Sequence, residues 1–246
     1  MKFEELKKQL LNLYEVFFAD MRIDKKTGVV AGTNLRFTGF PYIGKNYCDA
    51  PIKILFIPLD VGKDECEEDN TYHTFENRES IFPSGMLDFN AHIAGLYATA
   101  LYILKDKMGF QSAWDALWGN REFKSAKAIR MSYEYLPQDL MSYVAYENRY
   151  RFVTIGRGNK KGERGGGKDR IWINANREVT LLLDEINVFN PDVIVFQGKD
   201  GLWNCRTDEL KKKYKVVVAH HPSWWQGGAD KLQYIVEQIA PQLLNQ

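Results

Sequence analysis

Three short apolar runs, each ended by residues that break secondary structure, limit the folds open to this chain. They cover residues 54–57, 193–196 and 216–219. A continuous apolar run of this length is typical of a strand buried on both faces, as strands are in a parallel sheet. Helical spacing of apolar residues fills much of the sequence between the runs. We therefore predict an α/β fold with three layers, α/β/α, around a short, mostly parallel central sheet.

Several further elements are expected from the spacing of apolar residues. Helices are predicted over residues 3–18, 86–108, 136–146, 172–188 and 229–244. One more strand is predicted over 150–155, and the segment 36–47, rich in aromatic residues and glycine, is predicted to be a loop. Trp114 and Trp118 lie four residues apart in a helical segment, so both are expected in the core.

Length and composition are those of an ordinary globular protein. The chain has 246 residues, of which 45% are hydrophobic and 26% charged, enough to fill a large core. We predict a single domain over residues 1–246, with an N-terminal helix within 1–20 packed on it. The net charge of +1 means that nucleic acid would have to bind a local basic surface.

Cysteine usage and the N-terminus suggest a location. The three cysteines, Cys48, Cys66 and Cys205, are scattered and odd in number, which suggests reduced thiols rather than a disulfide framework. The N-terminus is charged, unlike a signal peptide, and no apolar run approaches membrane-spanning length. We expect a cytoplasmic monomer that does not bind a membrane.

The first apolar run leads into a candidate site. Pro58 cannot donate to a sheet ladder, so the strand should end there, and Gly62 suits a tight turn. Between them lies Asp60, on a loop at the carboxyl end of the strand, where open α/β sheets bind their ligands. From the residues alone, Asp60 could equally well cap the next element or bond its own turn.

The last apolar run also leads into a loop with unusual side chains. His221 is followed by Pro222 and Ser223, and then by Trp224, Trp225 and two glycines. A glycine-rich loop cannot easily bury two indoles, and an exposed aromatic residue on such a loop usually contacts a ligand or partner.

These two stretches together resemble the uracil-DNA glycosylase superfamily. Its members pair a strand-end motif of the GQDPY, GEAPG or GINPG kind with a C-terminal HPS loop, here read as PLDVG and HPS. Residues 185–198, EINVFNPDVIVFQG, are similar to the family's helix, proline, buried strand and glycine. The resemblance covers roughly residues 53–228. It departs from the GQDPY branch at Pro58, where that branch has glycine, and at Gly62, where it has tyrosine.

The resemblance implies roles for the two strand-end loops. Asp60 falls where the GQDPY branch has its water-positioning carboxylate, and His221 falls on the histidine that donates to the base. Trp225, or its neighbour Trp224, falls on the apolar residue that wedges into DNA and fills the gap left by a flipped base. Ser223 of the same loop is expected to contact DNA.

The resemblance also implies a base pocket. Tyr72 or Phe75 would stack on the extruded base, although packing in the core is the alternative for both. Asn148 or, in another alignment, Asn159 would read the pyrimidine edge, because one amide both donates and accepts. A surface loop position is the alternative for Asn148. Gly62 has no side chain to press on the C5 edge, so the pocket is expected to admit C5-modified pyrimidines as well as uracil.

A glycine-rich basic loop over residues 157–170 provides the local positive charge. It holds six cations and two acids, a local charge of +4, which suits contacts with phosphates. Its expected DNA-binding residues are Arg157, Lys160, Lys161, Arg164 and Lys168. A flexible surface loop with no DNA contact is the alternative.

The predicted activity is that of a monofunctional DNA glycosylase, acting on a flipped uracil or C5-modified pyrimidine in DNA repair or anti-phage defence. No metal or other cofactor is expected, and three cysteines cannot supply the four that hold an iron–sulfur cluster in some members of the family. The partner is duplex or single-stranded DNA. Two alternatives stay open: a non-catalytic DNA-binding relative, and a metal-dependent phosphoesterase or nuclease. The latter would use Asp60 with the acidic run Asp64, Glu65, Glu67, Glu68 and Asp69.

Overall fold

The computed structural model describes residues 1–58, 74–75, 78, 91–119, 136–155, 175–198, 208–222 and 231–244. The chain forms two compact units that alternate along the sequence. Unit 1 comprises Met1–Tyr42, Leu59–Arg78 and Glu147–Asn190, and unit 2 comprises Ile43–Pro58, Glu79–Tyr146 and Pro191–Gln246. The expectation of one domain over 1–246 stays a prediction. No helix within the described ranges is long and apolar enough to cross a membrane.

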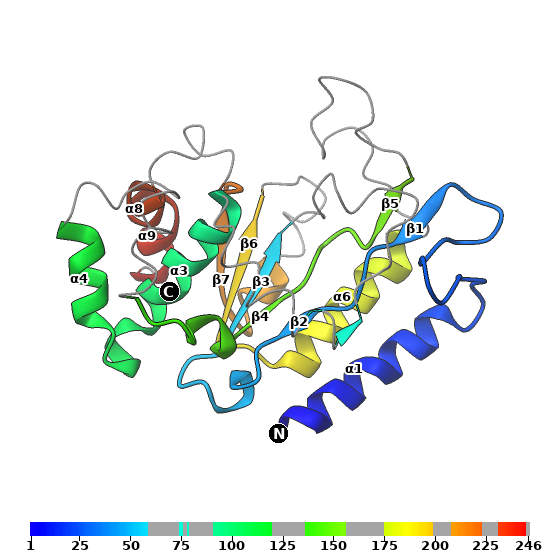
Figure 1. Cartoon of the computed structure of the whole chain (residues 1–246), viewed down its shortest axis with the longest axis horizontal. Helices are drawn as coiled ribbons and strands as arrows, with labels where there is room; N and C mark the ends of the chain where they lie inside the picture. Colours follow the sequence, from blue (N-terminus) through cyan, green and yellow to red (C-terminus); the bar gives the residue numbers. More distant parts are fainter. Residues whose placement is uncertain are drawn as a thin grey trace. The chain divides into compact units, whose positions relative to one another are not determined.

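A five-stranded sheet, which apart from Tyr42 belongs to unit 2, has the order β2-β4-β3-β6-β7 (Figure 1). Its strands are β2 (Tyr42–Ile43), β3 (Ile54–Pro58), β4 (Val144–Tyr146), β6 (Val193–Gln197) and β7 (Lys215–Ala219). β3 runs parallel to β4 and to β6, and β6 runs parallel to β7. The α/β class, the mostly parallel sheet and the three strands predicted from apolar runs are confirmed.

The strand order creates a switch point between β3 and β6. From β3 the chain moves to β4 on one side and then returns past β3 to β6 on the other side. In open α/β sheets, ligands bind outside the carboxyl ends of the strands at such a point. Here the carboxyl ends form one row, because Pro58 pairs with Gln197 and Gln197 pairs with Ala219.

The longer helices of unit 2 gather beside the β7 end of this sheet (Figure 1). They are α3 (Ala91–Met108), α4 (Gln111–Gly119), α8 (Lys231–Tyr234), the π-helix η9 (Ile235–Ile239) and α9 (Ala240–Leu244). The short helices η1 (Tyr47–Asp49) and η6 (Leu140–Tyr143) contact each other. The Gln242 amide of α9 bonds both the N–H and the C=O of Val218, at 3.0 Å each. These bonds cover the backbone of β7, which is the edge strand of the sheet.

Unit 1 packs two helices onto a short strand pair. α1 (Phe3–Phe18) lies beside α6 (Ala175–Phe189), and β1 (Leu35–Phe37) pairs with β5 (Phe152–Thr154) in antiparallel register (Figure 1). Their apolar side chains share one core, which includes Tyr14, Phe17, Phe37, Phe152 and Leu181. The predicted N-terminal helix therefore packs as an amphipathic helix should.

Two of the expected elements and one expected core residue are wrong. Residues 144–146 form a strand rather than the end of a helix, because all three are buried beside β3. The expected loop over 36–47 contains most of β1 and all of β2. Trp118 is 46% exposed, whereas Trp114 is buried as predicted.

A buried ionic cluster links α6 of unit 1 to the segment between β4 and β5. Arg151 donates from Nη2 to Glu147 Oε1 at 2.8 Å and to Glu185 Oε2, and from Nε to the Tyr14 hydroxyl at 3.1 Å. All four residues are almost completely buried. Burial raises the pKa of Glu147 and of Glu185, and the positive charge of Arg151 partly opposes the shift.

We predict that Arg151→Met lowers the free energy of unfolding by about 3–5 kcal/mol, because it leaves two buried carboxyl groups without their cation. Asp20→Asn is the control, since Asp20 is 69% exposed and pairs with Arg177 at 2.8 Å. Solvent screens such an exposed pair, so its loss should cost far less. Urea unfolding monitored by circular dichroism measures both values. Equal losses in the two variants would contradict the role given to the cluster.

We further predict a pH signature for Glu147. A carboxyl group whose pKa is raised by folding stabilises the protein below its unfolded pKa of about 4.3, and this contribution is lost as the pH rises toward the folded pKa. Glu147→Gln cannot ionise, so its free energy of unfolding should rise relative to wild type between pH 4 and pH 8. Urea unfolding across that range tests this, with exposed Glu15→Gln as the control. If the free energies of unfolding of wild type and Glu147→Gln change with pH in the same way, the raised pKa of Glu147 is wrong.

Candidate functional site

The segment that follows β7 carries His221 and is held by side chains of α8. The Tyr234 hydroxyl donates to the carbonyl of His220 at 2.9 Å. The Lys231 ammonium, itself fully buried, donates to the carbonyl of Pro222 at 2.7 Å. Bonds on both sides of His221 therefore fix its backbone at the carboxyl edge of the sheet.

The His221 ring lies against a second histidine from α3. The ring centroids of His92 and His221 are 4.5 Å apart, and the Tyr146 ring at the end of β4 lies 5.9 Å from His92. His92 Nε2 lies 3.3 Å from Oε1 of Gln197, the last residue of β6. We call His92, Tyr146, Gln197 and His221 the strand-end cluster, because three of them come from the carboxyl ends of β4, β6 and β7.

His92 is a neutral group in this environment. Desolvation of its ring, together with the charges of His221 and Lys231, lowers its pKa to about 3, against the opposing effect of the hydrogen bond with Gln197. An amide oxygen only accepts, so the His92 proton lies on Nε2 and its Nδ1 is an acceptor. His92 therefore presents one neutral donor and one neutral acceptor.

Glycine at position 95 allows α3 to approach the His221 segment. A Cβ atom on Gly95 would lie 2.3 Å from Pro222 Cβ and 2.7 Å from Pro222 Cγ. Both distances are too short for real carbon contacts, so only glycine fits at this position. The close approach brings His92, one helical turn earlier, within reach of His221.

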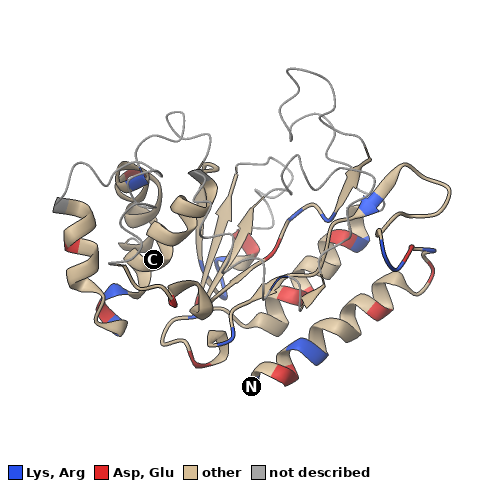
Figure 2. Cartoon of the chain, viewed as in Figure 1, with Lys and Arg blue, Asp and Glu red and all other residues tan. Residues whose placement is uncertain are grey.

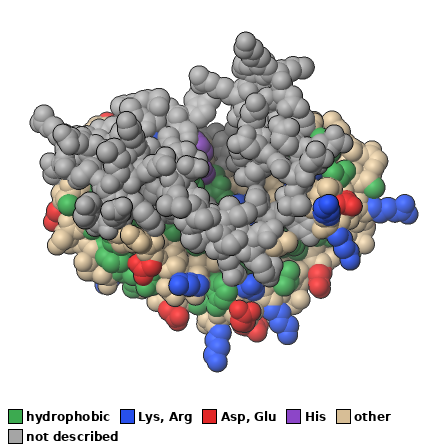
Figure 3. All heavy atoms as spheres, in the orientation of Figure 1, with side chains coloured by type: hydrophobic (Ala, Val, Ile, Leu, Met, Phe, Trp, Pro, Cys, Tyr) green, Lys and Arg blue, Asp and Glu red, His purple; other side chains and the backbone are tan. Residues whose placement is uncertain are grey.

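The Gln197 side chain connects two residues of the site. It is fully buried, its Oε1 lies 3.3 Å from His92 Nε2, and it also bonds the Tyr234 hydroxyl. Gln197 therefore links the His92 ring to the tyrosine that donates to the His220 carbonyl. Figure 3 shows histidine atoms at the surface of one face, next to hydrophobic side chains.

Two residues expected in the base pocket lie in unit 1. Asn148 is buried, and its Oδ1 has no partner within the described part of the chain, as a group that reads a base edge would require. Phe75 is also buried, and its ring is stacked on Phe40 at 4.9 Å and 9°. This is the core-packing role that was open for Phe75.

The other expected site residues lie outside the described residues, and their roles stay predictions. They are Asp60, Gly62, Tyr72, Arg157, Asn159, Lys160, Lys161, Arg164, Lys168, Ser223, Trp224 and Trp225.

Sequence reasoning missed His92 and Gln197. Gln197 had a visible signal, since it is a polar residue that ends an apolar run just before a glycine. His92 had only a weak one, as one of four histidines in the chain, within a segment read as helix.

Neither the distribution of charged residues nor a group of metal ligands helps to define the site within the described residues. Basic and acidic residues are interspersed along the described elements (Figure 2). No group of three or more His, Cys, Asp or Glu side chains that could hold a metal ion occurs among the described residues, and the acidic run 64–69 lies outside them.

No protein-family model and no curated protein sequence matches this chain.

We predict that Gly95→Ala displaces Pro222 and the adjacent His221. Alanine normally stabilises a helix interior by about 1 kcal/mol over glycine, but overpacking costs about 1–3 kcal/mol, so the net effect should be destabilising. The control is Pro222→Gly, which removes both carbon atoms that the new Cβ would meet. In that background Gly95→Ala should become neutral or stabilising in urea unfolding. The same loss in both backgrounds would contradict the steric explanation.

Proposed function

We propose that this chain is a DNA glycosylase that hydrolyses the N-glycosidic bond of an extruded uracil or C5-modified pyrimidine. The observation that carries the proposal is the row Pro58, Gln197 and Ala219 at the carboxyl edge of the sheet. Asp60 follows the first member of this row by two residues, and His221 follows the last by two. Two strand spacings, about 10 Å in all, separate the starts of their loops. That separation is suitable for a nucleotide bound between an acid on one side and an imidazole on the other.

Hydrolysis of an N-glycosidic bond needs a negative group near the sugar and a hydrogen-bond donor near the base, and Asp60 and His221 would provide them. As the bond between the base nitrogen and C1′ breaks, its electron pair leaves with the base and positive charge builds on the sugar. Asp60 would stabilise this cation and orient the water that adds to C1′. The proton that this water loses ends on the departing base, so the products are the sugar hydroxyl and the neutral base. His221 would donate a hydrogen bond to the base oxygen that gains negative charge.

The strand-end cluster supports the part assigned to His221. His92 lies against the His221 ring and is neutral. Gln197 holds the His92 ring at the same edge of the sheet. A fixed donor such as His221 gains strength as charge develops on the leaving base, so it favours the transition state over the ground state.

The proposal includes a more specific fold, the three-layer domain of the uracil-DNA glycosylase type. A parallel sheet with a switch point between β3 and β6 is the frame on which a three-layer, uracil-DNA-glycosylase-like domain would be built. Trp224 and Trp225, on the loop after His221, would fill the gap that the flipped base leaves in the DNA base stack. The basic loop over residues 157–170 would contact the DNA phosphates. Gly62 would leave the C5 side of the base pocket open.

The test is release of free bases from oligonucleotides that contain uracil, thymine, hydroxymethylcytosine or glucosylated cytosine, measured by mass spectrometry. We expect release of uracil or of a C5-modified base. We expect Asp60→Asn and His221→Gln each to reduce release by about 100-fold or more, with DNA affinity changed only a few-fold. Asp20→Asn, at an exposed position in unit 1, is the matched control.

Full activity of Asp60→Asn would overturn the assignment of the carboxylate. No released base from any substrate, combined with salt-dependent DNA binding, would instead identify a non-catalytic DNA-binding protein. Chelator-sensitive cleavage of the DNA backbone would identify the metal-dependent alternative.

A further inference from the structure

Side chains of the C-terminal helical segment, residues 231–244, bond the backbone of β7 and of the residues that follow it. Four side chains reach every second residue of this strand and its extension. Gln242 bonds Val218, Gln238 and Tyr234 bond His220, and Lys231 bonds Pro222. Alternate residues of a strand direct their backbone groups to the same edge, so this series of bonds covers the edge of the sheet as far as the two neighbours of His221.

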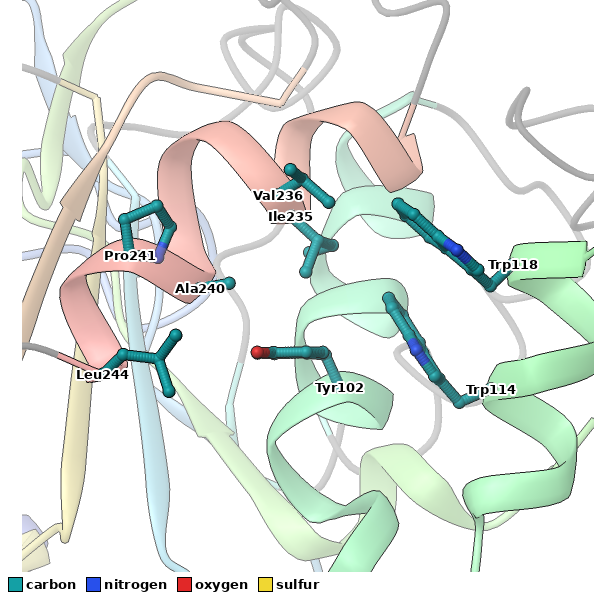
Figure 4. Close-up of a pocket in the computed structure, with 8 residues that line it drawn as sticks. All are labelled: Tyr102, Trp114, Trp118, Ile235, Val236, Ala240, Pro241 and Leu244. Carbon is teal, nitrogen blue, oxygen red and sulfur yellow. The ribbon is translucent and has the colours of Figure 1, made fainter.

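The other side of the same segment packs on α3 and α4. Ile235 lies in a pocket whose opposite wall is formed by Tyr102 of α3 with Trp114 and Trp118 of α4 (Figure 4). Consecutive helical residues do not face the same way, so Ile235 packs on these helices while Tyr234 bonds the extension of β7. Both side chains are fully buried, which holds the Tyr234 ring in place.

The Tyr234 hydroxyl determines the direction of a series of hydrogen bonds that ends at His92. A hydroxyl has one hydrogen, and that of Tyr234 is donated to the carbonyl of His220, which can only accept. In its bond with Gln197 the hydroxyl is therefore the acceptor, and the amide nitrogen of Gln197 is the donor. The amide oxygen is left for His92 Nε2, at 3.3 Å. The carbonyl of His220 thus determines that the His92 proton lies on Nε2.

Burial makes this direction difficult to reverse. Gln197 and Tyr234 are fully buried, so neither can readily replace its partner with water. Burial also raises the pKa of Tyr234 well above its ordinary value, although the bond from Gln197 partly opposes the shift, so the hydroxyl keeps its hydrogen at neutral pH. A reversed Gln197 amide would place its oxygen against a hydroxyl oxygen whose hydrogen is already donated, which is unfavourable in a buried site.

We propose that Tyr234 is a positioning residue of the strand-end cluster, which acts through Gln197 to keep His92 in a single tautomer beside His221. The effect on catalysis rests on the proposed function. If His92 exchanged between tautomers, each ring nitrogen would present a donor and an acceptor in turn. His221 lies against this ring, with centroids 4.5 Å apart. It would then lose the fixed orientation that a donor to the leaving base needs.

The test is Tyr234→Phe, which removes one oxygen atom and keeps the ring. The Gln197 amide can then turn and donate to His92 Nε2, which moves the His92 proton to Nδ1. NMR of the imidazole nitrogens at pH 7 distinguishes the two neutral tautomers. We expect only the Nε2–H form of His92 in wild type and a mixture with the Nδ1–H form in the variant. The kcat of base release should fall about tenfold, with KM changed less than about twofold.

Gln242→Met is the matched control, because it removes two hydrogen bonds to Val218 of the same strand, farther from His221. It should leave the His92 tautomer and base release unchanged. Gln197→Met breaks the same series of bonds at its middle member and should cause both changes seen in Tyr234→Phe. The double variant with Tyr234→Phe should lose no more activity than either single variant, because the two side chains act in one series. Circular dichroism verifies that each variant is folded.

His92 wholly in the Nε2–H form in Tyr234→Phe would overturn the proposal. So would an equal loss of base release in Gln242→Met, because general weakening of the segment would then explain the effect. Failure of the proposed function gives a different result, since wild type would release no base. A mixture of His92 tautomers in Tyr234→Phe would still support the positioning role of Tyr234 in that case, and an unchanged tautomer would still contradict it.

Discussion

The contact between Gly95 of α3 and Pro222 after β7 is the constraint on which the candidate site depends. The two residues approach so closely that any side chain at position 95 would collide with the proline ring. Lys231 holds Pro222 from another side by donating to its carbonyl. With the backbone fixed in this way, the His221 ring lies against His92, and the ring centroids are 4.5 Å apart.

The two units use different means to bury polar groups. In unit 1, Arg151 is buried together with Glu147 and Glu185, so the charges compensate one another. At the strand-end cluster of unit 2, burial instead keeps His92 neutral. A fixed hydrogen-bond donor such as His221 would suit the proposed reaction, in which negative charge appears on the ligand only in the transition state.

Much of the parallel sheet could be predicted from the sequence, because β3, β6 and β7 are continuous apolar runs. β4 could not be predicted, since it has only three residues within a stretch whose apolar spacing is helical, and its pairing with β3 decides its conformation. His221 was identified from its place after a strand. His92 could not be linked to it, because α3 is far away in the sequence and only the fold brings the two rings together. Trp118 has the spacing of a core residue, yet it lines an open groove.

The central claim is that the carboxyl edge of the sheet holds His221 against a neutral His92. The most direct measurement is a pH titration of the imidazole nitrogen resonances by NMR, with the His92 signal assigned through His92→Gln. The account predicts that His92 stays in its Nε2–H form down to pH 4 and is half protonated at about pH 3. Titration of His92 near its ordinary value of about 6.5 would contradict the account, because the ring would then be solvated and not held between Gln197 and His221.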